Sequence, residues 1–176
     1  MHVDRIRTLR GALAGATAAT VWAAQMPLDK RVFACDFDDV ELLGKLVTRR
    51  PAWPLWGVVM HLANGAVFGA VYANLAPRLP LPSWARGPVT ALAEHTLTWP
   101  LNGATDRLHP ARDTMPAVLT NPRAVAQATW RHVLFGVVLG ELERRLNAEP
   151  AAEIPSYADV VSSNGHGNLE RAASVR

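Results

Sequence analysis

The sequence predicts an all-α fold: a four-helix transmembrane bundle of two similar helical hairpins, with an amphipathic interfacial helix after the first span. Three observations predict it. Apolar residues gather in four blocks separated by polar or proline-containing segments. Small residues recur at every fourth position within several blocks, and a pattern in the first two blocks returns in the last two. The bundle would occupy residues 1–148, and the polar tail, 149–176, is predicted to be disordered.

The first block, residues 9–26, is apolar beyond its opening Arg10 and is long enough for a spanning helix. Gly11 and Gly15, continued by Ala19 and Ala23, would let a second helix backbone approach closely. A secretory signal is an alternative for this segment, since its start is basic and small residues follow. Cleavage would break the repeat, so a retained span is favoured.

Pro27 is expected to end the first helix, because proline removes a backbone donor. A polar connection follows, in which Asp38 can cap a helix whose apolar positions are Val40, Leu43, Leu46 and Val47. The acidic residues of this connection could hold a divalent cation, but they lack the spacing and glycine of a calcium loop: Asp36, Asp38, Asp39 and Glu41. A capped, solvated helix start is the favoured interpretation.

The second block, residues 55–75, has no charged side chain and is the clearest span. The prolines that follow, at 77, 80 and 82, predict a short turn and an antiparallel return. The third block, 87–99, is short and contains Glu94 and His95, so its context supports it more than its hydropathy. The fourth block, 124–142, is apolar apart from Gln127, Arg131, His132 and Glu141.

An internal repeat supports the two hairpins. Phe68-Gly69, Val71, Leu75, Arg78 and Leu79 near the end of block two match Phe135-Gly136, Val138, Leu142, Arg145 and Leu146 in block four at identical spacing. Arg10-Gly11 and Arg86-Gly87 similarly open blocks one and three. The sequence therefore predicts two hairpin copies related by an axis along the membrane normal.

Six polar side chains fall at a similar depth in blocks two, three and four: His61, Asn64, Glu94, His95, Arg131 and His132. Ionisable groups at such depth must face the bundle interior, pair, or touch water. We therefore predict an intramembrane polar cluster with a potential Glu94–Arg131 ion pair. Five tryptophans lie near the same side, as in an aromatic belt: Trp22, Trp53, Trp56, Trp99 and Trp130.

The favoured functional prediction is an integral membrane protein with a structural or accessory role, in which the cluster fixes helix register. One alternative is a small transporter or channel-like protein that uses Glu94, Arg131 and the histidines for proton or anion binding. Another is a b-type haem protein with two of His61, His95 and His132 as axial ligands. No cofactor, metal site or catalytic residue is predicted, because neither a nucleophile elbow nor a metal-binding histidine spacing occurs.

Several segments resemble small uncharacterised bacterial multi-span membrane proteins of the YagU-like kind. They are the glycine-rich first span, the stretch 37–44, the stretch 61–73, and Glu94-His95 with Trp99-Pro100. The resemblance covers about residues 9–146. It implies an inner-membrane location and no established reaction.

The predicted location is the inner membrane, as a multi-pass protein with both termini in the cytoplasm. Arginines crowd the span ends on that side: Arg5, Arg7, Arg10, Arg78, Arg86, Arg144 and Arg145. The predicted partners are the lipid bilayer and a second copy or a larger membrane complex. Nucleic acid is not expected, because the basic residues are scattered. A soluble helical bundle is the competing class, but the second block has almost no polar face.

Overall fold

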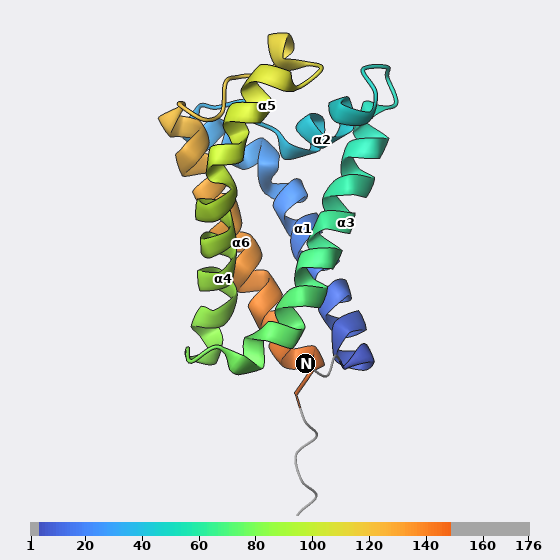
Figure 1. Ribbon diagram of the computed structural model, residues 1–176, viewed down its shortest axis with the longest axis vertical. Helices are drawn as coiled ribbons and strands as arrows, with labels where there is room; N and C mark the ends of the chain where they lie inside the picture. Colours follow the sequence, from blue (N-terminus) through green and yellow to red (C-terminus); the bar gives the residue numbers. More distant parts are fainter. Residues whose placement is uncertain (1–3, 149–176) are drawn as a thin grey trace, which may run out of the picture.

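The computed structural model describes residues 4–148 and is all helical over them, which confirms the predicted fold class. The predicted disordered tail, 149–176, lies outside the described residues. Four long helices run along the molecule, and two short ones lie at its upper end (Figure 1). The α-helices are α1 (Arg5–Phe33), α2 (Asp39–Val47), α3 (Trp53–Leu75), α4 (Ser83–Thr98), α5 (Asn102–Leu108) and α6 (Pro122–Leu146). The 3-10 turns are η1 (Ala76–Arg78), η2 (Trp99–Leu101) and η3 (Arg112–Thr114).

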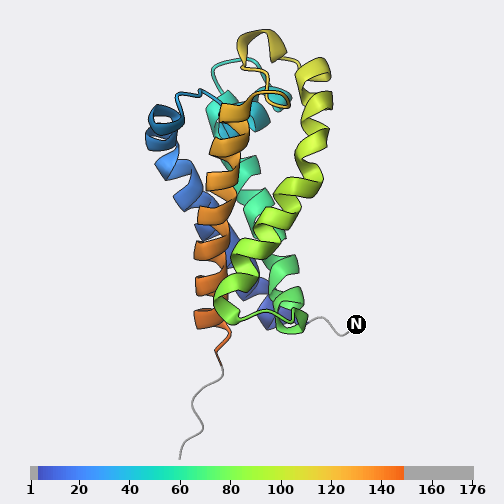
Figure 2. The ribbon, with the colours of Figure 1, turned by 90° about the vertical axis from the view of Figure 1, so that its left-hand side faces the viewer.

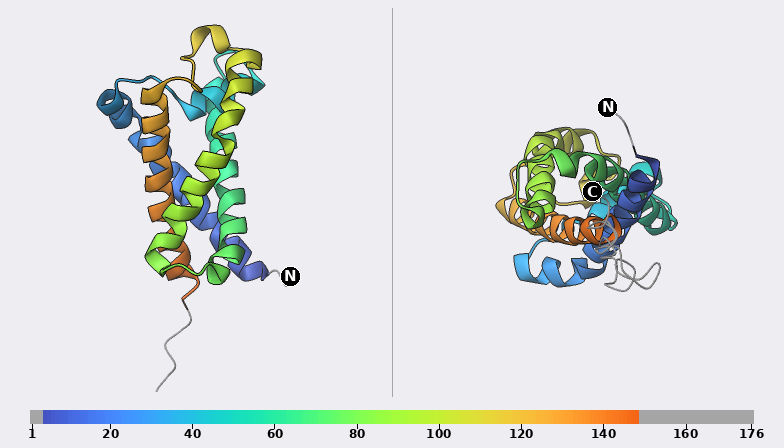
Figure 3. Two further views of the ribbon diagram at one scale, coloured as in Figure 1. Left: turned by 60° about the vertical axis from the view of Figure 1, so that its left-hand side comes forward. Right: turned by 90° about the horizontal axis from the view of Figure 1, so that it is seen from below.

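The long helices form two antiparallel pairs, α1 with α3 and α4 with α6. The two pairs meet mainly where α1 packs against α6, which lies between α1 and α4 (Figure 2). α1 is inclined to the other long helices as it crosses the bundle (Figure 3). α3 and α4 are joined by a turn at the lower end and lie apart toward the upper end (Figure 1).

Glycine allows both helix pairs to pack with their backbones in contact. A Cβ atom at Gly15 of α1 would overlap the carbonyl oxygen of Gly65 on α3. A Cβ atom at Gly87 of α4 would overlap the carbonyl oxygen of Gly136 on α6. Side chains at these positions would therefore force the helices apart.

The first helix extends beyond its predicted end. Pro27 lies inside α1, which continues to Phe33, so the expectation that Pro27 ends the helix is wrong. A proline costs one backbone hydrogen bond but keeps a helical φ, and here the flanking turns continue across it. The helix ends where Ala34 takes a positive φ of 47° and Cys35 donates its N–H to the Lys30 carbonyl.

The remaining helices contain the predicted blocks and extend past most of their limits. α3 covers the block 55–75, α6 covers 124–142, and α4 covers all but the last residue of 87–99, where η2 begins. α6 begins before its predicted block because Asn121 caps it: Asn121 Oδ1 accepts the backbone N–H of Arg123 at 3.0 Å.

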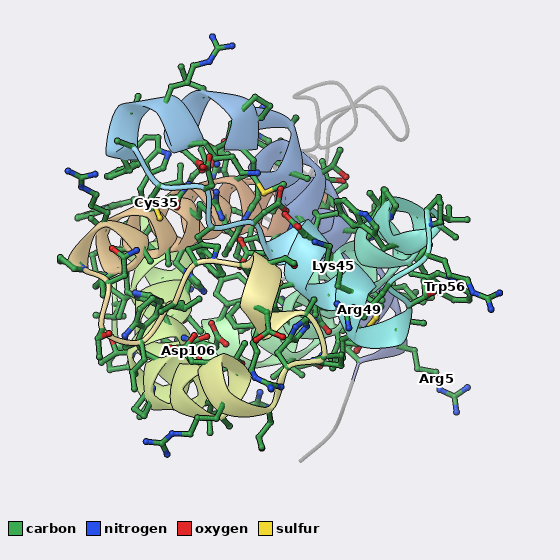
Figure 4. The ribbon with its side chains drawn as sticks, turned by 90° about the horizontal axis from the view of Figure 1, so that it is seen from above. Arg5, Cys35, Lys45, Arg49, Trp56 and Asp106 are labelled. Carbon is green, nitrogen blue, oxygen red and sulfur yellow. The ribbon has the colours of Figure 1, made fainter. Side chains whose placement is uncertain are left out.

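The predicted helix in the first long connection is confirmed as α2. Asp38 Oδ1 accepts the backbone N–H of Glu41 at 2.9 Å, which is the expected cap. Gly44 of α2 and Gly57 of α3 allow these two helices to cross closely. Across the upper end, Asp106 of α5 accepts the backbone N–H groups of Val118 and Leu119, each at 2.9 Å (Figure 4). These contacts fix the second long connection over the bundle.

One helical segment among residues 4–148, Trp53–Arg78, is long and apolar enough by composition to cross a membrane. The other long helices carry more charged residues, as Asp29, Lys30 and Arg31 do at the end of α1. The four-span bundle is thus not established by helix composition alone.

The interior of the bundle contains large polar side chains. The largest fully buried side chains are Arg131, Tyr72, Leu139, Gln127, Val118 and Asp29. Around them the helices meet mostly through small residues such as Ala14, Ala18 and Ala91. Trp22, predicted to belong to an exposed aromatic belt, is instead 7% exposed in this core.

Candidate functional site

Arg131 of α6 is the centre of a buried ionic network. Its Nε and Nη2 donate to the two oxygens of Asp29 at 2.6 and 2.7 Å, a bidentate contact. Its Nη1 donates to Asp39 Oδ2 at 2.7 Å, and Nη2 also donates to the Phe37 carbonyl at 3.0 Å. The side chains of Arg131 and Asp29 are 0% and 1% exposed. We refer to Asp29, Asp39, Gln127 and Arg131 as the sealed network.

Two glutamines complete the coordination of Asp29. Gln127, one helical turn before Arg131, donates from Nε2 to Asp29 Oδ1 at 2.7 Å and to the Cys35 carbonyl at 3.1 Å. Gln25, one turn before Asp29, donates to Asp29 Oδ2 at 2.5 Å. Together with Arg131, these amides surround the buried carboxylate of Asp29 with hydrogen-bond donors. Asp29 therefore remains a carboxylate.

The predicted Glu94–Arg131 pair is wrong. Arg131 points from α6 toward α1, while Glu94 belongs to α4 and pairs instead with His132, Oε2 to Nε2 at 3.2 Å. Consecutive residues of a helix are separated by about 100° around its axis, so Arg131 and His132 serve different faces of α6. Glu94 lies at a similar depth to both Arg131 and His132. The orientation of α6 about its axis turns His132, and not Arg131, toward Glu94.

The other five predicted residues come together around one cavity. His61, Asn64, Glu94, His95 and His132 all line a cavity of about 620 Å³, and we call them the cavity cluster. α3 and α4 form its walls, α1 and α6 close its inner side, and α2 covers its upper end. The remaining lining is largely apolar: Ala19, Trp22, Phe37, Leu42, Leu43, Gly65, Val67, Phe68, Val71, Ala91, Trp99, Ala128 and Phe135, with Asp39, Thr98 and Asn102 as polar additions.

The histidines of the cavity cluster have protein partners. His61 Nε2 lies 3.1 Å from the Ala19 carbonyl, and His95 Nε2 lies 3.0 Å from Thr129 Oγ1. His132 Nδ1 lies 2.7 Å from the Ala128 carbonyl while its Nε2 faces Glu94. Both nitrogens of His132 thus lie near oxygen atoms of the protein.

Trp22 joins the sealed network to the cavity cluster. Its Nε1 donates to Asp39 Oδ2 at 3.1 Å. Its ring makes edge contacts with His61 and His132, with centroid separations of 5.4 and 4.7 Å. Asp39 also belongs to both regions, because it binds Arg131 and lines the cavity.

Sequence patterns did not indicate that Asp29, Asp39, Gln127 and Trp22 belong to one site. Asp29 follows Pro27, in a segment expected to be a solvated connection, and Asp39 was assigned to a helix start. Two signals were available. The first is that an arginine inside an apolar block requires a carboxylate partner. The i, i+4 spacing of Gln127 and Arg131 was the second signal.

The described residues form no metal-binding group, and His95 and His132 are not arranged as a pair of axial haem ligands. Within residues 4–148, no group of three or more His, Cys, Asp or Glu side chains is arranged to hold a metal ion. The rings of His95 and His132 lie 4.4 Å apart and are tilted by 31°, so they stack on each other. Axial haem ligands approach iron from opposite sides, which this pair does not.

The carboxylates near α2 bind basic side chains. Asp38 pairs with Lys30 at 2.6 Å, Glu41 pairs with Lys45, and Asp39 pairs with Arg131. The alternative of a divalent cation bound by this acidic group is therefore not favoured. Comparison of the chain with family models, with curated proteins and with solved structures finds no match.

Proposed function

We propose that this protein is an integral membrane protein of four spanning helices with a structural or accessory role. The observation that carries the proposal is the inverted distribution of polarity. Arg131, Gln127 and Asp29 are fully buried, whereas large apolar side chains face outward on all four long helices. Water-soluble bundles bury apolar side chains and expose charged ones, so this pattern suits a lipid environment.

The exposed apolar side chains cover much of the outer surface. Leu9, Val67, Leu97 and Val137 are 71%, 65%, 78% and 50% exposed and belong to α1, α3, α4 and α6 respectively. Hydrocarbon solvates these side chains without cost, whereas water does not. The soluble-bundle alternative would need a further partner to cover them.

Helix length is compatible with four spans. α1, α3 and α6 have 29, 23 and 25 residues, and each exceeds the roughly 20 that a span requires. α4 has only 16 residues, but η2 and α5 continue it without a break to Leu108. The weakest predicted block therefore belongs to a longer helical segment.

Glycine packing supports the proposed hairpin repeat. Gly11 meets Gly69 in the first pair, and Gly87 meets Gly136 in the second. These are the positions that the sequence repeat aligns. The same glycines also bear on oligomerisation: they pack within one chain, so they do not by themselves call for a second copy, and an oligomer or larger complex stays a prediction.

Orientation follows from charge at the lower end. α1 begins and α6 ends at this end (Figure 1), and the turn between α3 and α4 lies there as well. Arginines at these helix ends favour a cytoplasmic location for them under the positive-inside rule. We propose the inner membrane as the location, in keeping with the YagU-like resemblance.

The geometry argues against the anion site of the transporter alternative and against the His95–His132 pair of the haem alternative. Arg131 is bound by two carboxylates and is 0% exposed, so it offers no site for an anion. The stacked pair of His95 and His132 does not suit axial haem coordination. Glu94 and the histidines still line an accessible cavity, so a role in proton or ligand binding stays open.

Alkaline carbonate extraction tests the membrane proposal. Membranes containing the full chain are washed with carbonate and centrifuged beside a peripheral and an integral control protein. The expected result is that the chain stays in the pellet and is released only by detergent. Recovery in the carbonate supernatant would contradict the proposal.

Cysteine labelling tests the number and direction of the spans. With Cys35 replaced by alanine, single cysteines are placed by Ser83→Cys at the lower end and Asp113→Cys at the upper end, both exposed. A membrane-impermeant maleimide should label Asp113→Cys in intact cells and Ser83→Cys only after lysis. The opposite pattern would reverse the orientation, and labelling of both in intact cells would contradict the proposed topology.

A further inference from the structure

Carboxylates outnumber the basic groups that contact them around the bundle interior. In the sealed network, Asp29 and Asp39 carry two negative charges against one positive charge on Arg131. Glu94 adds a third carboxylate, which His132 balances only when it is doubly protonated. These five groups therefore sum to at least one net negative charge. An excess of charge of one sign beside a mostly apolar cavity favours binding of a counter-ion.

Two of the three carboxylates face the cavity. Asp39 and Glu94 line it, with side chains 21% and 39% exposed, whereas Asp29 does not line it. No lysine or arginine contributes to the described lining. Asp39 is already bound by Arg131, which is shared with Asp29, whereas Glu94 contacts only His132 among the basic side chains. A cation that enters the cavity would therefore find Glu94 without a permanently charged partner.

We propose that the cavity between α3 and α4 binds a small organic cation, a single ammonium group on a compact apolar body. The ammonium would pair with Glu94, the more exposed of the two lining carboxylates. The apolar body would lie against Val67, Phe68 and Val71 of α3, which line the same cavity. This binding site does not depend on the membrane proposal, because the cavity and its charged side chains are formed by the chain itself.

The lining distinguishes this ligand from other classes. An anion would meet carboxylates and no free guanidinium, since Nε, Nη1 and Nη2 of Arg131 each already donate to a carboxylate. A zwitterionic phospholipid would bring a phosphate that no lining cation could bind. Trp22 and Trp99 also line the cavity, and aromatic rings attract ammonium groups.

Three probes of one shape test the charge requirement. They are 2-phenylethylammonium, 2-phenylethanol and phenylacetate, which share an aromatic body and differ in the head group. Binding to the full-length, detergent-solubilised protein is measured by titration calorimetry, with protein-free micelles as the blank. We expect the ammonium to bind at least about tenfold more tightly than the alcohol, and phenylacetate not to bind.

Variants locate the site. Glu94→Gln removes one lining carboxylate with little change in shape and should weaken the ammonium about tenfold while leaving the alcohol unchanged. Glu94→Asp keeps the charge and should keep binding within a few fold. Glu141→Gln on α6 is the matched control, because Glu141 lies outside the cavity and pairs with Arg144 and Arg145. Elution of each variant as a monodisperse species establishes that it is folded.

Each other outcome overturns the proposal. Equal binding of the ammonium and the alcohol would show that charge does not select the ligand. Tighter binding of phenylacetate would make the cavity an anion site. A folded protein that binds none of the probes, or whose ammonium binding survives Glu94→Gln unchanged, would rule out the proposed site. None of these results depends on the carbonate wash, so the two proposals can fail separately.

Discussion

The sealed network and the cavity cluster differ in solvent access, although Arg131 and His132 are neighbours on α6. Arg131 is 0% exposed, reaches across to α1, and donates to the buried carboxylate of Asp29, to Asp39 and to the Phe37 carbonyl. His132 turns toward α4 and pairs with Glu94, whose side chain is 39% exposed at the cavity. A carboxylate paired with a basic side chain is thus a structural element on one face of α6 and an accessible group on the other. The difference teaches that access, more than residue type, separates a structural ion pair from a candidate binding site.

Removing Arg131 should have the largest effect on stability. Arg131→Leu would leave the buried Asp29 without a cation, which typically costs about 3–5 kcal/mol, and would also remove the cation bound to Asp39. The expected result is a large loss of monodisperse protein and a lower Tm in detergent, measured by size-exclusion chromatography after heating. A Tm close to that of the wild type would show that the network is hydrated and not sealed.

Paired replacements identify the partner of Arg131. Asp29→Leu combined with Arg131→Leu should be less damaging than Arg131→Leu alone, because the pair leaves together. Glu94→Leu combined with Arg131→Leu should give no such relief. Tm values of the two double variants and the three singles form the measurement. Relief from the Glu94 combination would restore the pairing that the sequence suggested and contradict the geometry described above.

Loss of the buried amide should have an intermediate effect. Gln127→Leu removes hydrogen bonds to Asp29 and to the Cys35 carbonyl, and we expect it to lower stability by about 1–2 kcal/mol. Gln25→Leu also removes two hydrogen bonds, one to Asp29 and one from Trp130 Nε1, but from a partly exposed position, and is the matched comparison. A smaller decrease in Tm for Gln25→Leu than for Gln127→Leu would show that the buried hydrogen bonds contribute more to stability. Equal effects would argue that burial does not set the strength of these contacts.

The smallest effect on stability is expected in the cavity cluster. Glu94→Gln weakens a partly exposed pair with His132, and such pairs contribute about 0–1 kcal/mol. The Tm should therefore remain near that of the wild type, in contrast to Arg131→Leu. A loss as large as that of Arg131→Leu would place Glu94 in a structural role and remove the difference between the two faces of α6.

Much of the helical framework could be predicted from one-dimensional patterns. The four blocks, the cap at Asp38 and the glycines at every fourth position correspond to the long helices, α2 and their close crossings. The end of the first helix could not be predicted from Pro27, because a proline weakens a helix without always ending it. Whether the helix continues depends on contacts made by the residues that follow. Those contacts, made by Asp29 with α6, are between residues about 100 positions apart and leave no local pattern.

The sequence by itself determined that this chain is helical, which segments are apolar, and that an arginine and three histidines must be accommodated within them. Only the tertiary structure decided that Arg131 pairs with Asp29 and Asp39, that Glu94 pairs with His132, and that a cavity separates α3 from α4. The physical reason is rotational. Depth along a helix follows from residue number, whereas the direction of a side chain relative to its neighbours depends on how each helix is turned when its glycines pack.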